Sequence, residues 1–83
     1  LKLWEQATEY FTQALAIAKY VENRKEETHI LIDLAENYQH LGNTEHIKPL
    51  LKQAEEILNV RNATWAPPLI KRLITLKESL TPK

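Results

Sequence analysis

The fold is decided by residues 30–42, whose sequence is ILIDLAENYQHLG. Apolar side chains recur in this stretch every three or four residues, which is the spacing of one face of an α-helix. They are Ile30, Leu31, Leu34, Ala35, Tyr38 and Leu41. Gly42 follows the last of them, and a glycine there can take the left-handed conformation that ends a helix. The stretch therefore predicts a helix that ends at residue 41.

Three other segments have apolar residues at the same spacing. Together with the first, they predict helices over about residues 3–22, 25–41, 44–59 and 66–80. The chain has only one glycine and four prolines, and no segment alternates as a strand does. We predict an all-α fold of about four helices, forming a single domain over residues 1–83.

Polar residues mark where two of these helices begin. Asn23 is followed three residues later by Glu26, as in a capping box, which places the start of the second helix there. Asn43 or Thr44 can cap the third helix directly after Gly42. The second and third helices should therefore form a tight antiparallel hairpin.

Prolines add two further expectations. Pro67 and Pro68 suit the first turn of the last helix, where a missing N–H costs little. Pro49 falls about one turn inside the third predicted helix, where it can bend the axis. We treat a local kink and a straight helix as equal alternatives there.

The apolar pattern also repeats along the chain. A shift of 40 residues aligns Ala7, Phe11, Ala14, Ile17 and Ala18 with Ile47, Leu51, Ala54, Ile57 and Leu58. The second helix matches the fourth less well, because the same shift sets Tyr38 on Glu78 and Leu31 on Lys71. Self-similarity at a fixed period is typical of stacked helical repeats, with a divergent unit at an end.

Residues 34–42, LAENYQHLG, resemble the first helix and turn of a tetratricopeptide (TPR) repeat, with Leu, a small residue, Tyr and Gly at its spacing. Ala7, Phe11 and Ala14 resemble the preceding half-repeat. The resemblance covers about residues 3–59 and is closest to the 40-residue variety found in bacterial regulatory arrays. It implies antiparallel hairpins stacked as an α-solenoid. Another α-solenoid and a plain four-helix bundle are the structural alternatives.

In TPR-like arrays the first helix of each hairpin lines a concave groove that holds a peptide or a partner helix. The resemblance therefore implies a partner-binding groove with these residues: His29, Ile32, Asp33, Glu36, Gln39, His40, Lys71, Arg72 and Thr75. Ile32 lies off the main apolar stripe, so it faces either the groove or a neighbouring helix. Family members that grip a C-terminal carboxylate use Lys and Asn where this chain has Ile32 and Glu36, so a carboxylate clamp of that type is not expected. The groove side of the second helix is acidic to neutral, so a basic or mixed peptide is the expected ligand.

The charge balance excludes several classes of partner. Eleven basic residues balance eleven acidic ones, so no overall field draws in nucleic acid or an anionic membrane. Five basic residues gather near the C-terminus: Arg61, Lys71, Arg72, Lys77 and Lys83. We expect them to form a solvated face or to complement the acidic helices before them, and a weak patch for anions or nucleic acid is the alternative. No apolar run is long enough to span a bilayer.

Metal and catalytic sites are also not expected. His29 with Asp33, and Glu36 with His40, are one helical turn apart and read best as ordinary side-chain pairs, although zinc binding with His46 is the alternative. The chain has no cysteine, no glycine-rich phosphate loop and no nucleophile motif. We predict a non-enzyme without a cofactor or metal.

Three functional hypotheses follow. The first is a cytoplasmic interaction scaffold that binds a protein or peptide in its groove. The second is a regulatory or sensor segment of a larger bacterial signalling or transcription protein, since the chain starts without Met inside a helical pattern. The third is a unit that self-associates through exposed helix faces. Trp4 and Trp65 are expected to pack in the core or against an adjacent repeat.

Overall fold

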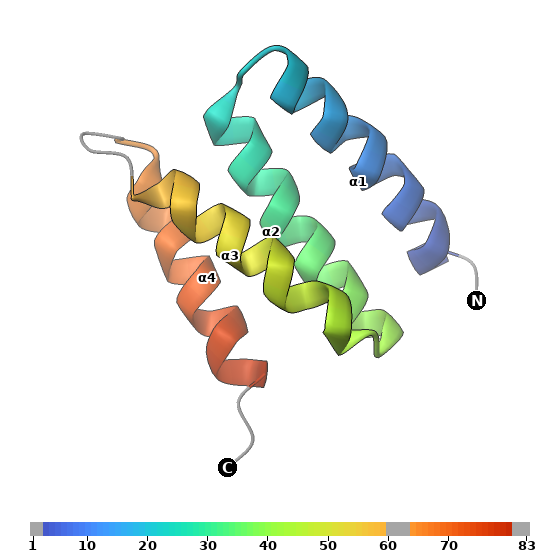
Figure 1. The fold of residues 1–83 in the computed structure, drawn as a ribbon. Helices are drawn as coiled ribbons and strands as arrows, with labels where there is room; N and C mark the ends of the chain where they lie inside the picture. Colours follow the sequence, from blue (N-terminus) through green and yellow to red (C-terminus); the bar gives the residue numbers. More distant parts are fainter. Residues whose placement is uncertain (1–2, 60–63, 81–83) are drawn as a thin grey trace.

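The computed structural model describes residues 3–59 and 64–80, and Figure 1 shows their path. Four α-helices account for most of them: α1 (Leu3–Tyr20), α2 (Arg24–Leu41), α3 (Ile47–Leu58) and α4 (Ala66–Leu80), with a 3₁₀ turn, η1 (Thr44–His46), before α3. The described residues contain no strand. The predicted all-α class and the four helices are confirmed.

Consecutive helices run antiparallel, and α2 lies in the middle of the arrangement (Figure 1). α1 packs along α2 on one side, while α3 and α4 pack against α2 and against each other on the other side. The molecule measures 39 × 34 × 17 Å, so it is a flat array with α1 and α4 at opposite edges. The predicted antiparallel hairpin of α2 and α3 is confirmed.

The core lies between α2, α3 and α4. Its fully buried side chains include Leu31 and Ile32 from α2, Ile47 from α3 and Leu69 from α4. α1 contributes only Ala18 to the buried residues of the described chain. This follows from its position, because α1 packs on a single neighbouring helix.

The turn between α1 and α2 ends α1 two residues earlier than predicted. Glu22 adopts a left-handed conformation with φ of 57°, which an L-residue cannot hold inside a right-handed helix. The N–H of Asn23 then donates to the carbonyl of Ala18 at 2.9 Å. Val21 and Glu22 therefore belong to the turn.

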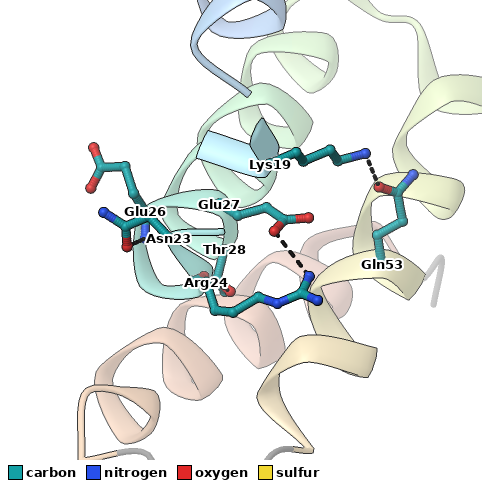
Figure 2. A network of polar contacts seen from close by, with 7 residues as sticks. All are labelled: Lys19, Asn23, Arg24, Glu26, Glu27, Thr28 and Gln53. Atoms are coloured by element: carbon teal, nitrogen blue, oxygen red, sulfur yellow. Dashed lines mark hydrogen bonds and ion pairs between the residues drawn. The ribbon is translucent and has the colours of Figure 1, made fainter. Parts of the chain in front are cut away.

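The start of α2 shows the predicted cap in part (Figure 2). The Asn23 side chain accepts a hydrogen bond from the Glu26 N–H at 3.2 Å, as expected. The reciprocal half of a capping box is missing, because the Asn23 N–H is already bonded to Ala18. Figure 2 also shows the ion pair between Arg24 and Glu27, whose charged atoms lie 3.2 Å apart. Glu27 is only 4% exposed, so Arg24 gives its buried carboxylate a partner.

The C-terminus of α2 lies where the sequence predicted it, at Leu41 before Gly42. Gly42 has φ of 76°, and its N–H and that of Asn43 donate to carbonyls of the last turn. The predicted cap of the next helix is wrong, since the Asn43 side chain contacts the His46 ring nitrogen at 2.8 Å and makes no cap hydrogen bond.

The intervening turn η1 delays the start of α3 to Ile47. That shift places Pro49 in the first turn of α3, where backbone N–H groups have no partner within the helix. Pro67 and Pro68 likewise fall in the first turn of α4. None of the three prolines removes a hydrogen bond from the interior of its helix.

Candidate functional site

A groove of about 650 Å³ runs between α2 and α4. It is lined by Glu36, Gln39, His40, Pro68, Lys71, Arg72, Thr75, Leu76 and Ser79. The α4 members recur every three or four residues, so they form one face of that helix beside its core-facing leucines. The α2 members lie on adjacent turns and form the opposite wall.

Six of the nine residues predicted for a partner-binding groove line this one hollow: Glu36, Gln39, His40, Lys71, Arg72 and Thr75. Asp33 lies next to it and contacts Arg72. His29 is half-buried and is not among the lining residues. The groove therefore gathers side chains that are more than 30 residues apart in the sequence.

Ile32 is a correction to the predicted set. Its side chain has 0% exposure and belongs to the core shared with α3 and α4. Ile32 therefore packs against neighbouring helices, and no ligand in the groove could touch it. The apolar stripe of α2 is wider than its spacing indicated because two helices, α3 and α4, cover it from adjacent directions.

Three lining residues were missed by the sequence reading: Pro68, Leu76 and Ser79. Pro68 and Ser79 carry the signal that could have found them, since they follow the spacing of Lys71, Arg72 and Thr75 along α4. Leu76 was assigned only to the apolar stripe. It is 4% exposed and forms part of the apolar floor.

Arg72 ties the two walls together. Its guanidinium lies 2.7 Å from a carboxylate oxygen of Asp33 and 3.1 Å from one of Glu36. Partial burial lowers the pKa of Arg72, but the hydrogen bonds and negative charges of Asp33 and Glu36 outweigh it and raise this pKa above its ordinary value. Arg72 carries one positive charge against the two carboxylates of α2, and Lys71 on the same wall supplies a second, so the groove is close to neutral.

A second polar contact links the walls near the C-terminal end of α4. The Gln39 amide donates to the Ser79 hydroxyl at 2.9 Å, and that hydroxyl donates to the Leu76 carbonyl at 2.7 Å. By contrast, Lys71 and Thr75 are exposed and have no side-chain hydrogen bond or ion pair within residues 3–59 and 64–80. Their donors are available to a ligand.

Trp4 lies beside the groove and not in the core, which was one of its two expected positions. Contact with an adjacent repeat, the other one, stays a prediction. Its ring stacks on the His40 imidazole with a centroid distance of 4.1 Å and an interplanar angle of 9°, and it is 44% exposed. A smaller hollow of about 320 Å³ lies between α1 and α2, and it shares Glu36 and His40 with the main groove. Trp65 packs half-buried against the core, as predicted.

Apart from His29, the suspected metal ligands are engaged in other contacts. Asp33 and Glu36 pair with Arg72, His40 stacks on Trp4, and His46 stacks on Tyr38. Within the described parts of the chain, no three His, Cys, Asp or Glu side chains lie close enough together to hold a metal ion. None of the helices found there has the length and apolar character that crossing a membrane requires.

Arg72 and Lys77, of the basic residues near the C-terminus, pair with acidic neighbours. Arg72 contacts Asp33 and Glu36, and Lys77 contacts Glu55 of α3. This is the arrangement expected if these cations complement the acidic helices before them. Arg61 and Lys83, the outermost of these basic residues, lie outside the described residues.

Comparison of the chain with family models, curated proteins and solved structures found no match.

Proposed function

We propose that this chain is a protein-interaction module that binds a peptide segment of a partner protein in the groove between α2 and α4. One observation carries the proposal. Six residues that the resemblance to TPR repeats implies for a binding surface line a single hollow of about 650 Å³. A groove with an apolar floor and a few exposed polar groups is the usual form of a binding site.

We further propose that the four helices are a segment of a TPR-like solenoid. The supporting observations are the 40-residue repeat and the position of α2, which packs on α1, α3 and α4. In such a stack the groove helices, α2 and α4, lie side by side, and Arg72 bridges them. A plain bundle would not require the repeat.

The groove defines the chemistry of its ligand. The spacing from Pro68 to Ser79 along α4 corresponds to about 16 Å of helix, which an extended peptide of about five residues spans. Arg72 is engaged by Asp33 and Glu36, while Lys71 and Thr75 are open. We propose a mixed-charge ligand with a carboxylate that meets Lys71 and an apolar side chain over Leu76.

Selection from a random peptide library on the purified chain tests this proposal, with fluorescence anisotropy to measure the affinity of the selected peptides. Thr75→Trp fills the groove from an exposed position on α4, and Thr12→Trp makes the same change at an exposed position on α1. We expect Thr75→Trp to weaken binding at least about tenfold, since bulk in the groove removes direct contacts. Thr12→Trp should bind as the unmodified chain does.

Two results would contradict the proposal. One is a library that yields no peptide with affinity for a chain that circular dichroism shows to be folded. The other is a set of peptides that bind Thr75→Trp and Thr12→Trp equally well, which would place their site elsewhere. The cytoplasm is the proposed compartment, on the strength of the resemblance to bacterial regulatory arrays.

A further inference from the structure

The two edge helices each have an apolar face that the internal repeat marks as an interface. Ile17 of α1 corresponds to Ile57 of α3 at the 40-residue shift, yet Ile17 is 64% exposed and Ile57 is 8% exposed. The difference arises because α3 is packed by both α2 and α4, whereas α1 is packed by α2 alone. α1 therefore lacks a neighbour that its repeat counterpart has.

The bare face of α1 is a continuous stripe. Leu3, Tyr10 and Ile17 are seven residues apart and are 73%, 67% and 64% exposed. Seven residues make nearly two helical turns, so these side chains lie in line. Beside them, an apolar hollow of about 250 Å³ is lined by Ala14, Ile17, Ala18, Val21, Asn23, Glu26 and Ile30.

The helix that covers α3 identifies what would cover α1. Leu31 and Ala35 of α2 have 0% exposure and belong to the core cluster that contains Ile57 and Ala54 of α3. A helix with the α2 pattern, running antiparallel to α1, would bury Ile17 as α2 buries Ile57.

α4 is the counterpart of α2, in a register that differs by one residue from the sequence prediction. A shift of 39 residues sets the α2 positions 30, 34, 37 and 41 on Leu69, Leu73, Leu76 and Leu80 of α4. Asn37 of that α2 stripe faces α1, since it donates to the Trp4 carbonyl at 2.8 Å. The corresponding stripe of α4 faces the core, where α3 takes the place that α1 has beside α2.

The 39-residue register exposes the missing half of the interface. It sets Leu31 and Ala35 of α2 on Ile70 and Ile74 of α4, which are 37% and 51% exposed instead of buried. α4 therefore lacks a neighbour that packs on it as α3 packs on α2. The helix that matches α3 in the 40-residue repeat is α1. Each edge of the molecule carries the partner that the other edge lacks.

We propose that this chain self-associates head to tail, with the Ile70 and Ile74 face of α4 in one copy packing on the Tyr10 and Ile17 face of α1 in the next. Charge supports this pairing over α1 against α1. α1 has two glutamates and one lysine, whereas α4 has three cations and one glutamate. Pairing of unlike faces leaves one edge of each kind free, so the assembly grows with concentration.

Sedimentation of three variants and one mixture tests the proposal. Ile17→Glu disables the α1 face and leaves α4 intact, while Ile74→Glu does the reverse. We expect the unmodified chain to exceed the mass of a dimer at high concentration and each variant alone to stay monomeric. An equimolar mixture of the two variants should form a dimer that does not grow, because only one working pair of faces remains. Thr12→Glu, at an exposed position about 140° around α1 from Ile17, should assemble as the unmodified chain does.

Four outcomes would overturn the proposal. An unmodified chain that stays monomeric at millimolar concentration would leave these faces to another partner. Variants that are monomeric alone and also when mixed would show that the α4 face does not bind the α1 face, and a dimer of Ile74→Glu alone would indicate that α1 packs on α1. Assembly that persists in Ile17→Glu would place the interface elsewhere. The groove is untouched by either substitution, so peptide binding by both variants reports on the proposed function separately.

Discussion

Ile32→Val and Ile17→Val delete the same methyl group from opposite environments on two helices. Ile32 has 0% exposure in the core of α2, α3 and α4, whereas Ile17 is 64% exposed on α1. Both residues sit in helix interiors, so any cost of valine to helix propensity is shared. The difference between the two variants therefore measures burial.

The expected magnitudes are well separated. Removing one methyl from a packed core costs about 1 kcal/mol, since the lost transfer free energy adds to the cost of the cavity. In a domain of this size that loss lowers the melting temperature by about 4–8 °C. Ile17→Val should change the free energy of unfolding by less than about 0.5 kcal/mol, as exposed substitutions usually do. Valine is preferable to alanine at position 32, because a loss of about 2–5 kcal/mol could unfold a small domain entirely.

Urea unfolding followed by far-UV circular dichroism is the suitable assay, at a protein concentration low enough to keep the chain monomeric. The slopes of the transitions should agree among the unmodified chain and both variants, so that midpoints report stability alone. Equal losses in the two variants would refute the burial argument. If Ile32→Val left the free energy of unfolding unchanged, Ile32 would face the groove, which is the other position that the sequence left open.

Three further substitutions have defined outcomes in the same assay. Gly42→Ala should cost about 1 kcal/mol, since φ of 76° strains an L-residue while the added Cβ meets no atom within 4 Å; an unchanged midpoint would contradict this. Asn37→Asp should cost at least about 2 kcal/mol at pH 7, because it sets a carboxylate 2% exposed against the Trp4 carbonyl. Burial raises the pKa of that new carboxyl above about 3.9, so the loss should shrink as pH falls, and a pH-independent loss would count against this account. Arg72→Met should cost less than about 1 kcal/mol for each of its two ion pairs, since all three side chains are at least one-third exposed. The loss in the free energy of unfolding should be smaller in about 1 M salt, which screens ion pairs. A loss of the same size at low and high salt would show that packing of the Arg72 side chain dominates.

Helix positions were readable from the sequence because local patterns determine them. The fourth helix spans residues 66–80 as predicted, and the second begins one residue earlier than predicted. The errors lie at helix ends, at the left-handed Glu22 after α1 and in the connection from α2 to α3. Asn43 bonds His46 instead of a backbone N–H, and a 3₁₀ turn takes the place of the first predicted turn of α3.

The groove was predictable in its composition but not in its electrostatics. Helical spacing places Glu36, Gln39 and His40 on one side of α2, and in the structure this side of α2 forms one wall of the groove. The contact of Arg72 with Asp33 spans 39 residues and depends on how α4 docks. No local pattern specifies that docking, and the 40-residue shift misaligned α4 by one residue. The sequence therefore predicted an acidic to neutral α2 side, without the cation that α4 places against it.

Ile32 shows the limit of single-helix reasoning most clearly. A helix that packs on one neighbour has one apolar stripe, and Ile32 lies off the main stripe of α2. α2 packs on three neighbours, so nearly its whole circumference is covered along part of its length. The number of neighbours is a property of the tertiary arrangement, and the sequence left both positions of Ile32 open for that reason.

Peptide binding in the groove between α2 and α4 is the central claim, and an amide ¹H–¹⁵N NMR titration with a library-selected peptide tests it most directly. We predict that the largest shift changes fall on the backbone amides of Gln39, Lys71, Thr75 and Ser79 and saturate together. Changes concentrated instead on Tyr10, Ala14 and Ile17 would place the ligand on the exposed face of α1 and contradict the claim.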